Sequence, residues 1–262
     1  MDFERRRTLT VLGGGLAAGL MGSALLRCKP YPESESSSTS SESSEGSHVP
    51  LPYVALDPVH VGELAYRNFY RGDCMYGVFA SVVEALAEKV GEPFSSYPTS
   101  VTRYGAGGVV GWGTLCGAAN GAAMSIYLVS KSPAAAIGEV FGFYEKEALP
   151  NFQPSEPKFQ VASSVSGSTL CHVSISKWCD ASGYKSYSGE RLDRCAQLVA
   201  SVAKYTAEVL NAQTDGSFTS VHSLSGATVT CRSCHDAGGV LENSRGMMEC
   251  NTCHFTLPGD HP

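Results

Sequence analysis

Apolar and polar residues follow one another along the chain in four blocks. These are an apolar run near the N-terminus, a polar spacer, a long region with regularly spaced apolar positions, and a C-terminal stretch with few apolar residues. The regular region covers residues 53–215 and the last stretch covers residues 216–262. We expect the first to fold as a helical, cysteine-rich domain and the second as a small loop-rich segment, so that the fold is mainly α.

Helical spacing and capping residues predict four helices in the regular region. These helices follow Asp73 and end near Gly91, span residues 114–130, follow Pro133, and span residues 189–212. Strand signals are few, and the best are residues 161–165 and 170–175. The glycine- and alanine-rich residues 114–130 predict a helix that packs closely against its neighbours.

The N-terminal block resembles an export signal. Residues 1–28 contain a basic start followed by a weakly apolar run of Gly, Ala and Leu. The pair Arg6-Arg7 fits the twin-arginine route, which carries folded proteins, with an ordinary secretory signal or an uncleaved anchor as the alternatives. Cys28 is a candidate for lipid attachment, although Arg27 is not the small residue that lipoprotein signals use. We therefore expect a periplasmic protein.

Composition and charge exclude several classes of protein. A formal net charge of −6 over 262 residues argues against a nucleic-acid partner, because phosphate contacts need a basic face. Ten cysteines are too many for an ordinary cytosolic enzyme and too few for a disulfide scaffold of this length. No membrane span is expected in the mature chain.

Residues 29–52, rich in Ser and Glu, are expected to form a disordered linker.

Two CxxCH motifs lie in the C-terminal segment. Two thiols at this spacing bind the two vinyl groups of one haem c, and the next histidine becomes the proximal iron ligand. The expected attachment residues are Cys231, Cys234, Cys250 and Cys253, with His235 and His254 as the proximal ligands. A zinc ribbon is the main alternative, because its paired cysteines have the same separation. The histidine after each pair and the export signal favour two haem c groups.

Each haem iron then needs a sixth ligand or an open site. His222, nine residues before the first motif, is the preferred candidate, and His172 is the second. The remaining histidines are His48, His60 and His261. Met247 and Met248 are alternatives, although both lie close to Cys250 in the sequence. Ligation by two histidines would indicate electron transfer, whereas an open site would allow ligand chemistry.

Five further cysteines are spread over the helical domain: Cys74, Cys116, Cys171, Cys179 and Cys195. Cys116 follows a glycine-rich approach to a helix start, where backbone amides and the helix dipole stabilise a thiolate. Cys74 likewise begins a helix. Such thiolates suit the ligation of a metal or a cluster, and buried free cysteines or disulfides are the alternatives.

These motifs together resemble a known family. The series Cys74, Cys116-Gly-Ala-Ala-Asn-Gly121, Cys171 and Cys195 is similar to the redox-active family named for its C…CGAxxG…C…C pattern. Together with the two CxxCH motifs and the expected export signal, this series makes residues 55–256 resemble the split-Soret cytochrome c family.

The resemblance implies a periplasmic electron-transfer dihaem cytochrome of anaerobic, sulfate-reducing-type bacteria. Such proteins are homodimers whose stacked haems split the main absorption band. Their irons are bound by two histidines each, one of which can come from the partner subunit. The resemblance also implies an iron–sulfur centre, with [2Fe–2S] the expected type. Its candidate ligands are Cys74, Cys116, Cys171 and Cys195, with Cys179 as an alternate.

An electron carrier with redox protein partners is therefore expected rather than an enzyme. The alternatives are a small haem or iron–sulfur reductase with an open iron site and, less favoured, a zinc-ribbon binding module.

Overall fold

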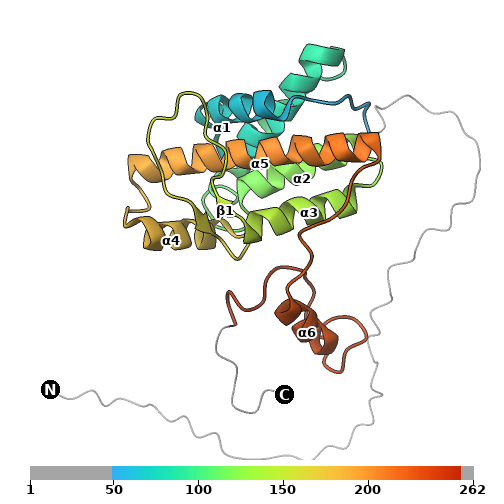
Figure 1. The fold of residues 1–262 in the computed structure, drawn as a ribbon, viewed down its shortest axis with the longest axis vertical. Helices are drawn as coiled ribbons and strands as arrows, with labels where there is room; N and C mark the ends of the chain where they lie inside the picture. Colours follow the sequence, from blue (N-terminus) through green and yellow to red (C-terminus); the bar gives the residue numbers. More distant parts are fainter. Residues whose placement is uncertain (1–48, 255–262) are drawn as a thin grey trace, which may run out of the picture. The chain divides into compact units, whose positions relative to one another are not determined.

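The computed structural model describes residues 49–254. The expected export signal, most of the expected linker, Cys28, His48 and His261 lie outside the described residues. The described chain is mainly α, as the sequence predicts (Figure 1). Its helices are α1 (Pro58–Val90), the 3-10 helix η1 (Thr99–Gly105), α2 (Gly117–Val129), α3 (Pro133–Lys146), α4 (Cys171–Ser182), α5 (Gly189–Asp215) and α6 (Gly226–His235). The strands β1 (Ala148–Leu149) and β2 (Ser164–Val165) pair antiparallel.

Helices α1, α2, α3 and α5 form the main bundle. Helix α5 lies along α1, and α2 packs against α1, α3 and α5 (Figure 1). Their apolar faces meet in one core that includes Val78, Phe79, Ile126, Tyr144 and Val199. Burial of this apolar surface is the main force that holds the bundle together. No helix within residues 49–254 is both long and apolar enough to cross a membrane.

Helix α1 is longer than predicted and is interrupted in the middle. Asp73 has a φ of 64°, in the left-handed region, so the helix breaks at Gly72 and Asp73 and begins again at Cys74. This new start is the one predicted at Asp73, and the helix ends before Gly91 as expected. The break turns the Cys74 end of the second segment toward the start of α2.

Helices α2, α3 and α5 agree with the predicted helices. Pro133 is the first residue of α3, and Ser188 caps α5 by accepting a hydrogen bond from the Arg191 backbone N–H at 3.1 Å. The capping side chain satisfies one of the backbone N–H groups that a helix start leaves without a partner. The ends of these elements are therefore set by local chemistry.

The predicted strand over residues 170–175 is wrong, because these residues begin helix α4. The buried residues of α4 are Cys171, Ser174 and Trp178, and this spacing is that of a helix face. Trp178 is fully buried and donates from Nε1 to the Ala162 carbonyl at 2.8 Å. Of the other predicted strand, residues 161–165, only β2 forms.

Residues 216–254 contain α6 and otherwise turns and loops. Ser225 caps α6 by accepting from the Thr228 backbone N–H, and the first CxxCH motif forms the C-terminal end of this helix. The second motif follows in a turn in which the His254 backbone N–H donates to the Cys250 carbonyl at 3.0 Å. The first motif thus has a helical backbone and the second a turn.

Candidate redox site

Both CxxCH motifs line the same cavity, which has a volume of about 600 Å³. Three of the motif cysteines and both motif histidines contribute: Cys231, Cys250, Cys253, His235 and His254. Burial raises the pKa of the Cys231 thiol, and the neighbouring Cys250 thiol adds to this rise. The two expected haem attachment sites therefore adjoin one another, and Cys234 completes the first motif one helical turn after Cys231.

His235 has a side-chain partner that fixes its ring. Its Nδ1 lies 2.8 Å from Asn243 Oδ1, on the loop that follows α6. This loop folds back on the motif, because the Ser244 backbone N–H donates to the His235 carbonyl at 2.9 Å. A histidine that binds a metal through Nε2 carries its proton on Nδ1 and donates it to such an acceptor. No motif or spacing in the sequence singles out Asn243.

The second motif is attached to the helical domain through the loop that precedes Cys171. Ser168 Oγ donates to Met248 Sδ at 3.2 Å, and Thr252 Oγ1 donates to the Gly167 carbonyl. The Glu249 backbone N–H also donates to Glu145 Oε1 at 3.3 Å. Residues 216–254, which carry the two CxxCH motifs and will be called the haem segment for their expected cofactor, thus contact the helical domain at residues 167–169.

Four of the five domain cysteines are buried and lie close together. All nine cysteines in the described residues are free thiols. Hydrogen bonds to Cys171 and then Cys74 lower the pKa of Cys116 well below its usual range. For Cys74 and Cys171, the hydrogen bond to Cys116 is the largest cause of a raised pKa, and burial is the second. The charge of Cys195 raises the pKa of both thiols further. The four buried thiols Cys74, Cys116, Cys171 and Cys195 will be called the thiol cluster.

Backbone pairing brings two members of the thiol cluster together. The Cys116 backbone N–H donates to the Thr169 carbonyl at 2.8 Å, and the Cys171 backbone N–H donates to the Thr114 carbonyl at 2.7 Å. Between them, Leu115 and Leu170 form an antiparallel bridge. Cys116 caps α2 and Cys171 begins α4, so two helix N-termini point toward the thiols and favour negative charge there.

Two glycines of the CGAANG sequence allow Cys116 to approach Cys74. A Cβ atom at Gly117 would lie 2.6 Å from the Gly105 carbonyl oxygen and 2.8 Å from Cys74 Cβ. One at Gly121, a helical turn later, would lie 2.6 Å from the Met75 carbonyl oxygen. Helix α2 can therefore pack against α1 at this distance only because both positions lack a side chain.

Buried polar groups surround the thiol cluster. Hydrogen bonds to Cys171 and Cys74 are the main causes of the low pKa of Cys116, and Tyr144 is a smaller one. The Tyr144 hydroxyl is buried and has no partner at ordinary hydrogen-bond length within residues 49–254. Arg194, immediately before Cys195 in α5, is almost fully buried. Neither residue is expected from the sequence, since a single Tyr or Arg within a helical pattern carries no sign of what it will contact.

Cys179 lies two turns further along α4 than Cys171 and is only half-buried. It is not among the thiols that change the pKa values of the cluster members. Within residues 49–254, no three His, Cys, Asp or Glu side chains already surround a point as a bound metal would require. The members of the thiol cluster are therefore neighbours and not a preformed cage of ligands.

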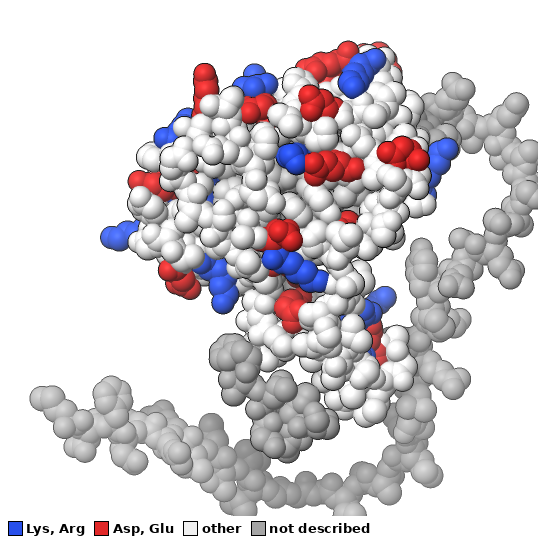
Figure 2. Space-filling view, viewed as in Figure 1, with Lys and Arg blue, Asp and Glu red and all other residues white. Residues whose placement is uncertain are grey.

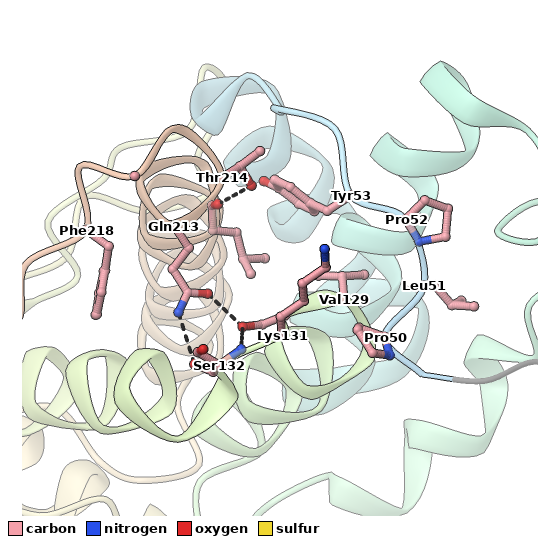
Figure 3. A pocket seen from close by; sticks show the side chains of 13 residues that line it. Pro50, Leu51, Pro52, Tyr53, Val129, Lys131, Ser132, Gln213, Thr214 and Phe218 are labelled. Carbon is pink, nitrogen blue, oxygen red and sulfur yellow. Dashed lines mark hydrogen bonds between the residues drawn. The ribbon is translucent and has the colours of Figure 1, made fainter.

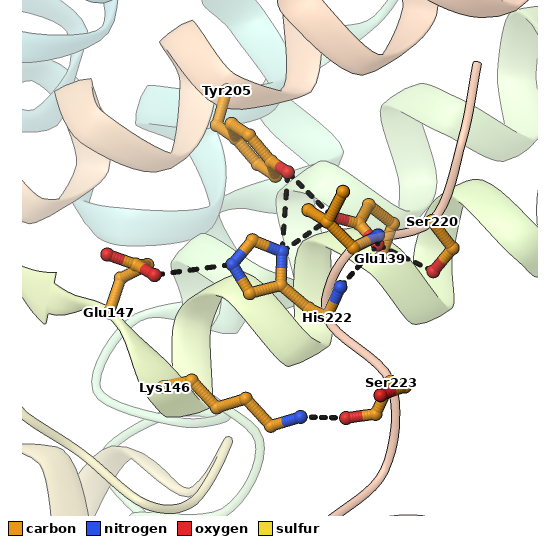
Figure 4. A network of polar contacts seen from close by, with 8 residues as sticks. Glu139, Lys146, Glu147, Tyr205, Ser220, His222 and Ser223 are labelled. Atoms are coloured by element: carbon orange, nitrogen blue, oxygen red, sulfur yellow. Dashed lines mark hydrogen bonds and ion pairs between the residues drawn. The ribbon is translucent and has the colours of Figure 1, made fainter.

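His222 is held by a buried carboxylate in the network of Figure 4. Its Nδ1 lies 2.5 Å from Glu139 Oε1, and its Nε2 lies 3.4 Å from Glu147 Oε1. Tyr205 and Ser220 also donate to Glu139, at 2.7 and 2.6 Å. Burial alone would raise the pKa of Glu139, but these hydrogen bonds outweigh it and lower the pKa to about 2.

Neither candidate for the sixth haem ligand lines the cavity of the CxxCH motifs. His222 lies against α3, and His172 lies at the start of α4, where its Nδ1 is 2.9 Å from the Gly113 carbonyl oxygen. His60 lies on α1 and pairs with Glu88 at 2.8 Å. As distal ligands, His222 and His172 remain predictions.

A second cavity, of about 590 Å³, lies between the start of the described chain and the ends of α2 and α5 (Figure 3). It is lined by Tyr53, Lys131 and Gln213 among others, and the candidate ligands are not part of its lining. Over the described residues visible in Figure 2, acidic and basic side chains are interspersed and form no large patch of one sign. The candidate chemistry is thus confined to the thiol cluster and the cavity of the CxxCH motifs.

Comparisons with known proteins agree with this arrangement. The family model described as "Putative redox-active protein (C_GCAxxG_C_C)" matches residues 78–209. The chain is 32% identical to the split-Soret cytochrome c of Desulfovibrio desulfuricans over 266 aligned residues, which cover 97% of this chain and 95% of that protein. A solved structure, described as showing a novel iron centre in that cytochrome, aligns with a TM-score of 0.73 and 34% identity. It covers 78% of this chain and 89% of its own.

The resemblance predicted from the cysteine series and the two CxxCH motifs is thereby confirmed. Both sets of residues lie in the aligned sequence, and the solved relative has the same fold over most of its length. The chain belongs to the split-Soret cytochrome c family, and its helical domain belongs to the C_GCAxxG_C_C redox-active family.

Proposed function

We propose that this protein is an exported electron-transfer cytochrome that carries two haem c groups and a cysteine-bound iron centre. The observation that carries the proposal is that both CxxCH motifs line one cavity. Covalent attachment at two such motifs would bring two porphyrins close together. Closely spaced redox groups are suited to moving electrons and need no substrate pocket.

The haem-binding residues have the chemistry that the proposal requires. Cys231 and Cys234 would hold one haem and Cys250 and Cys253 the other, with His235 and His254 as the proximal ligands. When bound, haem c supplies a one-electron iron couple. Asn243 would keep the His235 proton on Nδ1, which is the tautomer that binds a metal through Nε2.

The thiol cluster suits an iron centre. Its four thiols are buried, and two of them lie at helix N-termini that favour thiolates. Soft thiolate ligands of this kind are typical of iron–sulfur sites, and we propose a [2Fe–2S] cluster as the type bound here. The loop from Gly167 to Cys171 joins the thiol cluster to the second CxxCH motif. It contributes Cys171 to the cluster, and its Gly167 carbonyl accepts a hydrogen bond from Thr252 of the motif.

The cellular setting is part of the proposal. The basic start with Arg6-Arg7 supports export to the periplasm by the twin-arginine route, which accepts proteins that have already folded around a cofactor. Homodimers and redox protein partners are proposed from the resemblance to the family.

Absorption spectroscopy of the purified protein tests the haem part of the proposal. The pyridine haemochrome spectrum should give two covalent haems per chain, and the Cys231→Ser/Cys234→Ser variant should retain one. Carbon monoxide should leave the spectrum of the reduced protein unchanged, because both irons would carry six ligands. A carbon monoxide shift would favour the reductase with an open site. Zinc without haem would overturn the proposal in favour of a zinc ribbon.

A further inference from the structure

Arg194 is a buried charge without a carboxylate partner in the described residues. Only 1% of its surface is exposed. Its Nη2 donates to Ser174 Oγ at 3.0 Å, its Nε has no hydrogen-bond partner in residues 49–254, and no carboxylate there forms an ion pair with it. The adjacent Asp193 is not available, because it accepts hydrogen bonds from Tyr66, Tyr70 and Gln197.

An arginine side chain keeps its proton in a protein, so burial cannot neutralise it. An unpaired guanidinium in a protein interior is strongly unfavourable, and a chain that retains one is expected to offer it an anion. The position of Arg194 indicates which anion that is. It precedes Cys195 in α5, and its hydrogen-bond partner Ser174 lies one turn after Cys171 in α4.

Electrostatic effects on two neighbouring groups support this position. The pKa of Cys171 is raised mainly by its hydrogen bond to Cys116 and by burial, and the charge of Arg194 opposes that rise. Burial likewise raises the pKa of Tyr144, and Arg194 again acts in the opposite direction. Arg194 thus favours negative charge on the side of the thiol cluster that faces α4 and α5.

We propose that Arg194 is the counter-charge of the iron centre held by the thiol cluster, and that it raises the reduction potential of that centre. This inference rests on the proposed function. A [2Fe–2S] centre bound by four thiolates is anionic, because the four thiolates and the two bridging sulfides together carry more negative charge than the two irons carry positive charge. Reduction adds one electron from an external donor and no proton, so the centre becomes more negative. A fixed cation in a low-dielectric interior stabilises the reduced state more than the oxidised one.

The first test is a redox titration of the iron centre, followed by electron paramagnetic resonance with dithionite as the electron donor. Arg194→Gln should shift the midpoint potential of the centre to lower values, and Arg194→Lys should keep most of the wild-type value. Arg191→Gln is the matched control, since it removes the same charge from a partly exposed position in α5 and should leave the potential unchanged. An unchanged potential in Arg194→Gln would overturn the inference.

The second test is thermal unfolding with and without iron in the thiol cluster. Arg194→Met should raise the melting temperature of the iron-free chain, because it removes an unpaired buried charge. The same variant should lower the melting temperature, and the retention of iron, of the loaded chain. A purely structural arginine would give a loss in both forms, and that result would also overturn the inference.

The wild-type protein separates the two proposals. If its iron does not exceed its haem, the iron centre of the proposed function is absent and the inference falls with it. If excess iron is present and the Arg194 variants behave like the wild type, only the inference fails.

Discussion

At the scale of single residues, the chain surrounds its expected metal ligands with specific hydrogen-bond partners. Asn243 fixes the ring of His235, and Glu139 fixes that of His222. The cysteines and histidines of the CxxCH motifs could be predicted from the sequence because haem attachment depends on local spacing. Asn243, Glu139 and Arg194 could not, because their roles depend on contacts formed only in the folded chain.

Asn243 should tune the haem bound at the first motif. By accepting the Nδ1 proton of His235, its Oδ1 makes the imidazole more electron-donating, which stabilises ferric iron. Asn243→Ala should therefore raise the reduction potential of this haem, as measured by spectroelectrochemical titration. The haem at Cys250 and Cys253 is the internal reference, and a shift of both haems together would argue against this role.

Glu139 should make the stability of the protein depend on acid. Its pKa lies at about 2 in the folded protein, against an ordinary value of 4.5. By linkage, this difference in pKa stabilises the folded protein by about 3 kcal/mol when the pH is above the ordinary pKa. The stabilisation is lost as the pH falls from about 4.5 to about 2. Urea unfolding between pH 7 and pH 3 measures this effect.

The Glu139→Gln variant supplies the comparison. It should be less stable than the wild type at neutral pH, and the difference should shrink as the pH falls. Glu147→Gln is the control, because Glu147 interacts with His222 more weakly. Its side chain is nearly half exposed, and its Oε1 lies 3.4 Å from His222 Nε2. A Glu139→Gln variant as stable as the wild type at pH 7 would contradict the assigned hydrogen bonds.

At the scale of elements, the sequence predicted those helices that a start signal or a regular apolar face marks. Pro133 marks the start of α3, and apolar spacing marks α5. Helix α4 was predicted as a strand, since its buried face holds Ser174 between Cys171 and Trp178 and so lacks an apolar stripe. The first half of α1 was not predicted, and the pairing of residues 113–116 with 169–172 is a tertiary contact that no local pattern encodes.

The contact between α1 and α2 should be sensitive to a single methyl group. Gly121→Ala would place a Cβ atom 2.6 Å from the Met75 carbonyl oxygen, and backbone cannot move as a flexible side chain can. We expect a loss of about 1–3 kcal/mol in the free energy of unfolding, measured by chemical denaturation, together with weaker iron retention.

Gly138→Ala in α3 is the matched control, because nothing lies within 4 Å of its new Cβ. It should stabilise the helix by about 0.5–1 kcal/mol. Equal effects of the two substitutions would show that helix propensity, and not the close approach of α2 to α1, decides the outcome.

At the scale of the whole molecule, the thiol cluster and the haem segment are joined where residues 167–169 contact Met248 and Thr252. The two motif sets lie far apart in the sequence, and neither predicts this contact. The same loop continues into Cys171 and α4. Changes in the haem segment and in the iron centre are therefore expected to influence each other through a short stretch of chain.

If both motifs bind haem as proposed, the two neighbouring porphyrins should split the main absorption band. The Cys250→Ser/Cys253→Ser variant should bind one haem per chain and give a single band, since coupling needs two neighbouring porphyrins. Cys179→Ser should keep both haems and the splitting. A split band in the single-haem variant would require another origin for the coupling, such as a haem of a partner subunit.

The central claim is that one chain carries both haem and a separate iron centre. The most direct measurement is total iron against covalently bound haem in the same purified sample, repeated for Cys116→Ser. The account predicts more iron than haem in the wild type, and loss of that excess in the variant while the haem content is unchanged. Equal amounts of iron and haem in the wild type would contradict it.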